Sequence, residues 1–286
     1  MGSTDLEILS VLAQELNMRK AAERLYISQP ALSQRLRSIE KSWEQQIFLR
    51  SQKGLTLTPA GEKIVAHVNE TLQREEKLRD ELTALEKEVS GTLKLAVASI
   101  VGQYWLPQVL KRYVESYPHV KISLITGWSS DSLRHLYDDN IHLGIIRGEP
   151  EWKGEKYHLF TEKLYLVDTT ITSLDELQHT SRPFIQFKSD SSYFQEIHSW
   201  WRTTFGGQPE RTIIVDQIET CKQLALNGIG YAILPSITLT TSDRPINKIP
   251  LLDDEQKPLQ RNTWLLSDKT SQDLKQVQAF IDLVTK

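Results

Sequence analysis

The sequence predicts a mixed α/β protein with three consecutive parts: a helical N-terminal region, one long helix, and a larger region of alternating strands and helices. Residues 4–47 carry apolar side chains at helical spacing, and a long charged helical pattern follows Pro59. From Thr92 onward, strand-like runs alternate with amphipathic helices. A chain of 286 residues is long enough for two or three domains.

The composition is typical of a soluble globular protein, with 39% hydrophobic and 25% charged residues. The sequence contains no apolar run of the about 18 residues that a membrane-spanning helix needs. Its start lacks the basic and apolar blocks of a signal peptide. The single cysteine, Cys221, excludes an intramolecular disulfide. We therefore expect a cytoplasmic protein without a membrane partner.

Charge is distributed unevenly along the chain. Between Arg19 and Thr58 there are eight Lys or Arg residues and three Asp or Glu residues, a local net charge of +5 in a chain of net charge −3. A basic segment in an otherwise acidic chain is typical of phosphate binding. This segment indicates nucleic acid as a partner, although a small basic surface also arises by chance.

Residues 19–40 predict two helices that cross closely. Ala21 and Ala22 give the first helix a face of small residues, Ser28 predicts an N-cap, and Pro30 falls in the first turn of the second helix. Four apolar residues at spacings of four, three and four are predicted to face inward: Leu32, Leu36, Ile39 and Trp43.

The opposite face of the second helix has the amides, hydroxyl and cation that suit base edges and phosphates in a major groove. A β-like hairpin over Ile47–Thr58, turning at Lys53–Gly54, is predicted to bring Arg50, Ser51 and Lys53 to a tip that contacts phosphates or a minor groove. Together these features predict a winged helix–turn–helix, with a helical hairpin used only for packing as the alternative. The expected contacts with double-stranded DNA are Gln29, Pro30, Ser33, Gln34, Arg37, Arg50 and Lys53.

The N-terminal segment resembles the DNA-binding region of LysR-type regulators. The resemblance rests on Ala21-Ala-Glu-Arg-Leu, Ser28-Gln-Pro-Ala-Leu-Ser, Phe48-Leu-Arg and Leu57-Thr-Pro-Ala-Gly. Two segments depart from the usual pattern, Asn17-Met-Arg and Trp43-Glu44, and both lie off the predicted DNA-contacting face. The resemblance implies a transcription regulator that binds dyad promoter DNA, and it extends over the whole chain.

A helix of about 30 residues is predicted from Pro59 to Val89. Thr58 and Pro59 give it an N-cap and a proline in its first position. Its second half has apolar residues at heptad spacing between charged ones: Leu78, Leu82, Leu85 and Val89. A helix this polar with one thin apolar seam indicates pairing with a second helix, the alternative being a solvated single helix. The family resemblance implies a dimer or a tetramer.

From Thr92 onward the pattern predicts parallel sheets with crossover helices. The expected strands are Thr92–Ser99, Lys121–Thr126, His142–Arg147, Lys163–Asp168, Pro183–Phe187, Thr212–Val215, Gly230–Leu234 and Asn262–Ser267. The expected helices are Leu106–Ser116, Asp131–Asp138, Tyr193–Thr204, Ile218–Asn227 and Asp273–Thr285.

The order of these segments is similar to that of the LysR-type effector domain, which has two α/β lobes like those of periplasmic binding proteins. This resemblance implies a DNA-binding domain over residues 1–58, a dimerisation helix over 59–89 and an effector domain over 90–286. It places the first lobe at about 90–163 and 266–286, and the second at about 164–265. A small molecule is then expected between the lobes, where helix N-termini and strand ends meet.

Three cations at strand ends, with hydroxyls and helix N-termini, predict a site for an anion with several carboxylates. The expected ligand contacts are Ser99, Ile100, Ser129, Arg147, Gln186, Lys188 and Arg261. Ser129 can instead cap the following helix, and each cation can be merely solvated. Trp128, Trp200 and Trp201 are expected to pack in the core or between the lobes.

A narrower resemblance concerns the effector. Val97-Ala-Ser-Ile-Val-Gly-Gln, Ile145-Ile-Arg-Gly and Pro183-Phe-Ile-Gln-Phe-Lys-Ser-Asp are similar to the citrate-responsive catabolite control regulators of low-GC Gram-positive bacteria. The resemblance implies citrate as effector and genes of the tricarboxylic-acid branch as targets. A different organic acid or an amino acid stays an open alternative.

Two other functional classes fit the sequence less well. Cys221 lies in a helical pattern without a histidine nearby in sequence, and the histidines show no metal-ligand spacing, so neither an enzyme nor a cofactor is expected. A cytoplasmic solute-binding protein would suit the two lobes but leaves the DNA-binding segment unexplained.

Overall fold

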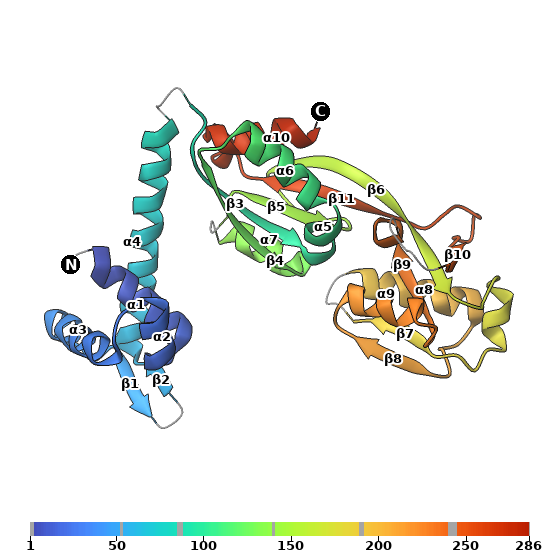
Figure 1. Cartoon of the computed structure of the whole chain (residues 1–286), viewed down its shortest axis with the longest axis horizontal. Helices are drawn as coiled ribbons and strands as arrows, with labels where there is room; N and C mark the ends of the chain where they lie inside the picture. Colours follow the sequence, from blue (N-terminus) through green and yellow to red (C-terminus); the bar gives the residue numbers. More distant parts are fainter. Residues whose placement is uncertain are drawn as a thin grey trace. The chain divides into compact units, whose positions relative to one another are not determined.

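The computed structural model describes residues 3–51, 54–84, 88–138, 141–188, 192–239 and 245–285. The chain packs as two compact units, Met1–Thr83 and Ala84–Lys286, drawn as ribbons in Figure 1. Among the described residues, no helix is both long and apolar enough to cross a lipid bilayer.

The first unit is a winged helix–turn–helix, as the sequence predicts. Its elements are α1 (Ser3–Glu15), α2 (Met18–Arg24), α3 (Gln29–Trp43), β1 (Phe48–Ser51), β2 (Gly54–Leu57) and α4 (Pro59–Ala84). Of the predicted inward stripe of α3, Leu32, Leu36 and Ile39 are buried, and Trp43 packs partly buried against the same core. The small-residue face of α2 is buried as well, since Ala21 is 0% exposed.

Side-chain caps fix the two helices that form the turn. Ser28 is the N-cap of α3, its Oγ accepting a hydrogen bond from the backbone N–H of Ala31 at 3.3 Å. Asn17, one of the departures from the family pattern, is the N-cap of α2. Its Oδ1 accepts from the backbone N–H groups of Arg19 and Lys20 at 3.0 and 3.1 Å. An amide therefore supplies the acceptor that α2 needs at its first turn.

The segment that leads into the hairpin is held by α3 and lies close to the start of α4. Glu40 of α3 accepts hydrogen bonds from the backbone N–H groups of Ile47 and Phe48 at 2.9 and 3.2 Å. The Oγ1 of Thr58 accepts from the N–H of Gly61 at 2.9 Å and so caps α4. A Cβ on Gly61 would lie 2.1 Å from the carbonyl oxygen of Ile47, so only glycine permits this approach.

The described part of α4 ends at Ala84, before the predicted end at Val89, and Leu85 lies outside the described residues. Val68 is buried in the core of the first unit. Leu78 and Leu82, two members of the predicted heptad seam, are 54% and 56% exposed. The distal part of α4 thus presents leucine side chains to solvent within a single chain.

The second unit contains a mixed sheet covered by helices. In chain order its elements are β3 (Gly91–Ala98), α5 (Ser99–Tyr104), α6 (Leu106–Ser116), β4 (Val120–Gly127), α7 (Ser129–Tyr137), β5 (Leu143–Arg147), β6 (Glu155–Asp168), η1 (Asp175–Gln178), β7 (Phe184–Phe187), α8 (Ser192–Phe205), β8 (Thr212–Val215), α9 (Ile218–Leu226), β9 (Tyr231–Pro235), η2 (Ser236–Leu239), β10 (Asn247–Pro250), β11 (Gln260–Ser267), η3 (Ser271–Asp273) and α10 (Lys275–Thr285). The strand order in the described residues is β4-β3-β5-β11-β6-β9-β7-β8, with β10 also paired to β6.

The predicted parallel pairing with crossover helices is present in both lobes, but the sheet also contains antiparallel pairs. β3 pairs in parallel with β4 and β5, and β7 with β8 and β9, as crossover helices require. β6 and β11, however, pair antiparallel with each other, and each also pairs antiparallel with a further strand. These two strands carry the chain from the first lobe (β3, β4, β5) to the second (β7, β8, β9) and back, which makes them run in opposite directions.

Strand alternation distributes the apolar side chains over two faces of the first lobe. Leu95, Val97 and Ile145 pack against α6 and α10, whereas Ala96 and Ile146 pack against α7. Figure 1 shows α6 and α10 on one side of this sheet and α7 on the other. In the second lobe, α8 covers one face with Trp200 and Trp201, both buried as expected, and α9 covers the other.

Several element limits differ from the predictions. β6 begins at Glu155, eight residues before the predicted strand start at Lys163, because its first half pairs with β11 instead of forming a loop. The short edge strand β10 and helix α5 were not predicted. The helix Leu106–Ser116 has the predicted limits.

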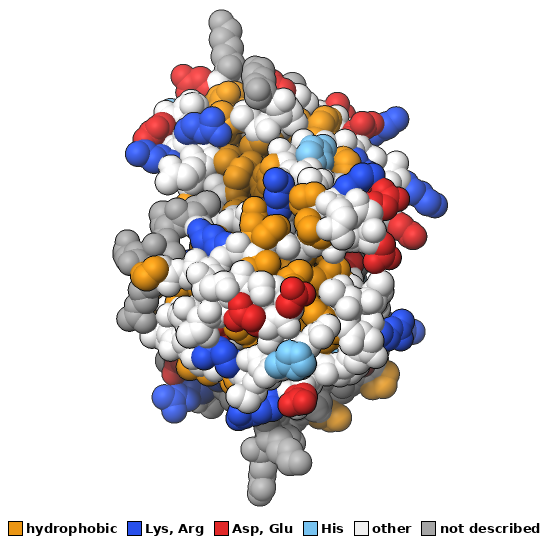
Figure 2. Space-filling view, turned by 90° about the vertical axis from the view of Figure 1, so that its right-hand side faces the viewer, with side chains coloured by type: hydrophobic (Ala, Val, Ile, Leu, Met, Phe, Trp, Pro, Cys, Tyr) orange, Lys and Arg blue, Asp and Glu red, His pale blue; other side chains and the backbone are white. Residues whose placement is uncertain are grey.

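Some large apolar side chains of the second unit are exposed. Leu124 and Ile125 of edge strand β4 are 40% and 42% exposed, and Ile214 of edge strand β8 is 63% exposed. Figure 2 shows one face of the molecule, on which apolar side chains gather in a band between charged ones. Apolar surface of this kind is typical of protein contacts.

Candidate functional site

The outer face of α3 has the residues that the sequence assigns to DNA. Gln29, Pro30, Gln34 and Arg37 are exposed, and Ser33 is half-buried. The amides and the guanidinium are therefore available to a ligand, because the apolar stripe holds the opposite face of the helix in the core. Whether these residues contact DNA stays a prediction.

Arg50 lies against α3. Its Nη2 donates to the Oγ of Ser33 at 3.0 Å, so this wing residue and the helix form one hydrogen-bonded surface. Arg35 on the same helix forms an ion pair with Asp5 of α1, with 2.6 Å between Nε and Oδ1. This pair links α3 to α1 and gives Arg35 a structural role. Lys53 lies outside the described residues, as does the side chain of Ser51.

A cavity that is partly open to solvent lies where the two lobes of the second unit meet. Five of the seven predicted ligand residues line it: Ser99, Ile100, Ser129, Arg147 and Arg261. The complete lining is Ala98, Ser99, Ile100, Gln103, Gly127, Trp128, Ser129, Arg147, Phe187, Tyr193, Asp216, Gln217, Ile218 and Arg261.

The other two predicted residues lie elsewhere. Gln186 lines a separate, smaller pocket beside Phe194, and Lys188 is exposed and does not line the interlobe cavity. The expected cluster of three cations is thus a pair of arginines in this cavity, because Lys188, the residue directly after β7, does not line it.

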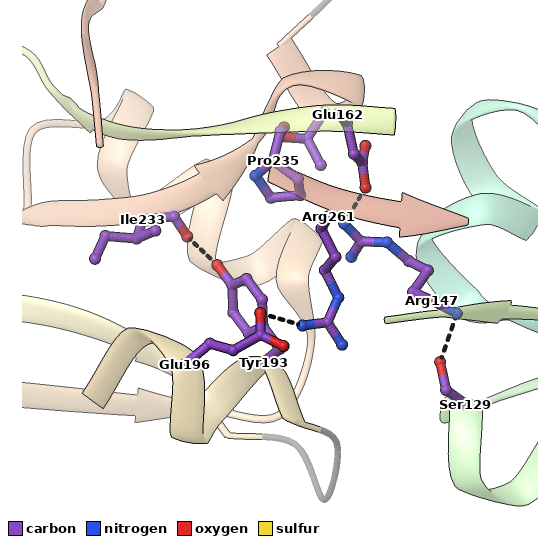
Figure 3. Close-up of polar contacts among 9 residues, drawn as sticks. Ser129, Arg147, Glu162, Tyr193, Glu196, Ile233, Pro235 and Arg261 are labelled. Atoms are coloured by element: carbon purple, nitrogen blue, oxygen red, sulfur yellow. Dashed lines mark hydrogen bonds and ion pairs between the residues drawn. The ribbon is translucent and has the colours of Figure 1, made fainter. Parts of the chain in front are cut away.

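Arg147, the last residue of β5, is held from two sides. Its Nη2 donates to Oε1 of Glu162 on β6, and its backbone N–H donates to the Oγ of Ser129 at 3.2 Å (Figure 3). The side chains of Arg147 and Glu162 are 9% and 4% exposed. Burial raises the pKa of the Glu162 carboxyl, although the ion pair with Arg147 opposes this shift.

Arg261, in β11, is also paired. Its Nη1 donates to Oε2 of Glu196 at 2.8 Å, and its guanidinium lies 5.3 Å from the centre of the Tyr193 ring. Burial and then the nearby charge of Arg147 lower the pKa of Arg261. The Arg261 side chain is 2% exposed, whereas that of Glu196 is 44% exposed. Figure 3 shows both arginine–glutamate pairs beside one another.

Two longer helices, α7 and α9, begin at the cavity. Ser129 starts α7, and Gln217 and Ile218 start α9, so the positive ends of two helix dipoles lie near the arginines. Ser99 donates its hydroxyl to the carbonyl oxygen of Gly127 at 3.0 Å, which ties α5 to the end of β4. The lining can bind a negative group.

Sequence reasoning missed the carboxylates of this site. Glu162 is in phase with the buried residues Leu164 and Leu166 on β6, and a charged residue at a buried position was the available signal. Asp216 lies in the loop before α9 and gives no comparable signal. Trp128, expected in the core or between the lobes, is 40% exposed and lines the interlobe cavity.

Cys221 has no access to a substrate. It is fully buried, its thiol donates to the carbonyl oxygen of Ile185 at 3.2 Å, and burial raises its pKa to about 12. A thiol of this kind is protonated at neutral pH and packs as a small apolar side chain.

Comparison with known proteins gives the family. Residues 3–62 match the bacterial regulatory helix-turn-helix protein, lysR family, and residues 86–286 match the LysR substrate binding domain. The chain is 62% identical over 280 residues to the uncharacterized HTH-type transcriptional regulator YkuM of Bacillus subtilis (strain 168), covering 98% of this chain and 95% of that one. YraN of the same organism, also uncharacterized, is 37% identical and covers 99% and 97% of the two chains.

Solved structures share the fold. The crystal structure of full-length CbnR complexed with its target DNA has a TM-score of 0.72 at 20% identity and covers 99% of both chains. Full-length AphB of Vibrio cholerae, a virulence activator, has a TM-score of 0.65 at 16% identity and covers 99% and 98% of the two chains. With both family models matched and close relatives along its length, the chain belongs to the LysR family of DNA-binding transcriptional regulators with an effector-binding domain.

Proposed function

We propose that this regulator binds dyad promoter DNA through α3 and the hairpin, and that a small organic anion in the interlobe cavity controls it. Citrate is the first candidate effector, and genes of the tricarboxylic-acid branch are the candidate targets. The observation that carries the proposal is the convergence of Arg147 and Arg261, from neighbouring strands, on one cavity.

The proposed DNA contacts are Gln29, Pro30, Ser33, Gln34, Arg37, Arg50 and Lys53. Support comes from the exposed amides of α3 and from the Arg50–Ser33 hydrogen bond, which holds a wing cation against the helix. Amides recognise adenine edges, and arginines bind guanine or phosphate. We propose that residues 1–58 bind DNA, residues 59–89 dimerise and residues 90–286 bind the effector, in the cytoplasm.

The anion is supported by charge and dipoles. Two guanidinium groups and the N-termini of α7 and α9 border the same cavity. We propose Ser99, Ile100, Ser129, Arg147 and Arg261 as contacts, with Gln186 and Lys188 reached only if the second lobe rearranges around the effector.

An amino acid is the second candidate, and one observation favours it. Asp216 lines the cavity with an exposed carboxylate, which would suit an ammonium group while the arginines bind the carboxylate. Citrate and an amino acid therefore place opposite demands on Asp216, and a replacement at this residue separates them.

The proposed control passes through lobe closure. An effector that binds the closed form more tightly shifts the equilibrium between open and closed lobes. In a dimer or tetramer assembled through α4 and the exposed apolar surface, this shift changes the spacing of the DNA-binding domains and thus DNA bending.

Calorimetric titration of the full chain with citrate, isocitrate, malate and the common amino acids tests the effector. Arg147→Ala should weaken binding at least tenfold. The matched control is Arg134→Ala, because Arg134 is an exposed arginine paired with Asp131 on α7, away from the cavity. An Arg147→Ala chain that binds citrate as tightly as the parent would contradict the proposed site.

Titration of the chain's own promoter fragment tests DNA binding. Arg37→Ala should weaken promoter binding and lower its salt dependence. Arg112→Ala, which removes an exposed arginine of α6, should change neither. Absence of promoter binding at low ionic strength, with and without organic acids, would contradict the function itself.

A further inference from the structure

The main cation of the cavity already has a counter-ion from within the chain. Arg147 comes from β5 and Glu162 from β6, and their side chains meet in an ion pair that is almost fully buried. β6 is one of the two strands that carry the chain between the lobes. Figure 3 shows Glu162 on this strand with its carboxylate directed at the Arg147 guanidinium.

The second arginine is neutralised in the same way, by Glu196 of α8. The carboxylates of Glu162 and Glu196 thus balance the two guanidinium groups, and Asp216 adds a further negative charge to the lining. An anionic effector therefore meets a cavity without net positive charge from side chains. Tight binding requires that one internal carboxylate give up its arginine or its charge.

We propose that Glu162 is an internal counter-ion which an anionic effector displaces from Arg147, and that the displaced carboxylate takes up one proton from solvent. This inference rests on the proposed binding of an anion in the cavity. The balance is simple: the effector carboxylate replaces the Glu162 carboxylate at Arg147, and the proton converts Glu162 to its neutral acid.

The surroundings of Glu162 favour this exchange. Four groups from four neighbouring elements act on it: Arg147 of β5, Arg261 of β11, the backbone N–H of Ile237 in η2, and Tyr193 of α8. Its second oxygen, Oε2, is buried and has no hydrogen-bond partner among the described residues. Oε2 is therefore incompletely satisfied, and a buried carboxylate oxygen without a partner is less strongly held in its charged form.

The charges around Glu162 also favour its protonation when an anion is bound. Burial already raises the pKa of Glu162 while Arg147 is its partner. An effector carboxylate at Arg147 removes much of that attraction and adds a negative charge nearby, and both changes raise the pKa further. The complex then binds more protons than the free protein, so effector affinity rises as pH falls. One proton corresponds to at most about a tenfold change in Kd per pH unit.

Glu196 gives a matched control. It forms the same kind of pair with an arginine of the cavity, but its side chain is 44% exposed, so water supports its charge after displacement. Glu196→Gln should alter affinity while leaving the proton uptake of the parent intact. Glu162→Gln keeps the size and polarity of the side chain and removes the charge and the titrating group.

The test is calorimetric titration of the full chain, Glu162→Gln and Glu196→Gln with citrate, in two buffers of different ionisation enthalpy. The pH is chosen where citrate is fully ionised. Sulfate is a second probe, because it does not titrate in this range. We expect uptake of up to one proton by the parent and by Glu196→Gln, none by Glu162→Gln, and at least tenfold tighter citrate binding by Glu162→Gln.

Each outcome has a distinct meaning. Citrate binding without proton uptake by the parent, or equal uptake by Glu162→Gln, overturns the counter-ion but leaves the proposed effector site standing. Binding of citrate or sulfate only by Glu162→Gln supports the counter-ion and removes citrate as the effector. If neither anion binds any of the chains, both proposals fail. The parent measurement decides on its own if Glu162→Gln does not fold, which circular dichroism shows.

Discussion

Asp168, at the end of β6, shows how a single carboxylate organises a turn. It is fully buried; its Oδ1 accepts from the backbone N–H groups of Thr170 and Ile171 at 2.6 and 2.9 Å, and its Oδ2 accepts from Arg182 at 2.9 Å. Burial alone would raise the pKa of Asp168, but these donors outweigh it and lower the pKa. The charged form therefore stabilises the fold.

Asp168→Asn should lower the free energy of unfolding by about 3 kcal/mol at neutral pH, because Arg182 loses its counter-charge in a partly buried site. A lowered pKa in the folded state means that the Asp168 contribution is present above about pH 4 and is lost as pH falls through the folded-state pKa. Denaturant melts at pH 7 and pH 3 check this.

The exposed Asp138 supplies the comparison for that prediction. Asp138→Asn should change stability by less than about 0.5 kcal/mol at either pH. Equal stability losses for the two variants would show that the Asp168 hydrogen bonds contribute nothing particular.

Among individual residues, part of the candidate site can be predicted from the sequence. Ser99, Ser129 and Arg147 follow strands or start helices, so strand and helix patterns alone predict that they share an edge. Glu162 and Asp216 could not be placed, because their positions depend on how the second lobe packs against the first. The same dependence applies to Lys188, which does not line the cavity and stays a predicted contact.

Among the elements, the junction between the hairpin and α4 makes a strict steric demand on the sequence. Gly61 is buried, and a Cβ there would lie 2.1 Å from the Ile47 carbonyl oxygen. Gly61→Ala should therefore cost about 2 kcal/mol or more and loosen promoter binding, because α4 must shift away from the hairpin. Thermal melts and promoter titration measure both effects.

Gly207 is the suitable control for this substitution, since nothing lies within 4 Å of a Cβ built on it. Gly207→Ala should be neutral or slightly stabilising. A Gly61→Ala chain as stable as Gly207→Ala would disprove the steric argument.

Element prediction succeeded where one face of a helix is apolar, as in α6, whose limits follow from its amphipathic pattern. It failed for the first half of β6 and for β10. β6 forms an interlobe ribbon with β11, and β10 is an edge strand of only four residues, two of them exposed. Neither has a periodicity that a short window of sequence reveals.

On the scale of the whole molecule, the exposed leucines of α4 are the feature that a single chain leaves unexplained. Leu82 is 56% exposed in the predicted heptad seam. Leu82→Glu should abolish or weaken self-association by at least tenfold in dissociation constant, because it places a charge in the apolar seam of a paired helix. Sedimentation velocity over a concentration series measures this.

Leu82→Ile keeps the seam apolar and should associate like the parent chain. If Leu82→Glu sediments like Leu82→Ile, α4 does not mediate the association, and the exposed strands β4 and β8 become the surface to test.

The antiparallel pairing of β6 with β11 has an architectural consequence. Lys163 and Gln260 face one another across the ribbon, so the two ends of the intervening segment are neighbours. The second lobe is thus an insertion into the first, and both of its connections run through the two-stranded ribbon of β6 and β11. Because both connections run side by side, removal of the second lobe would leave the two broken ends of the chain next to one another.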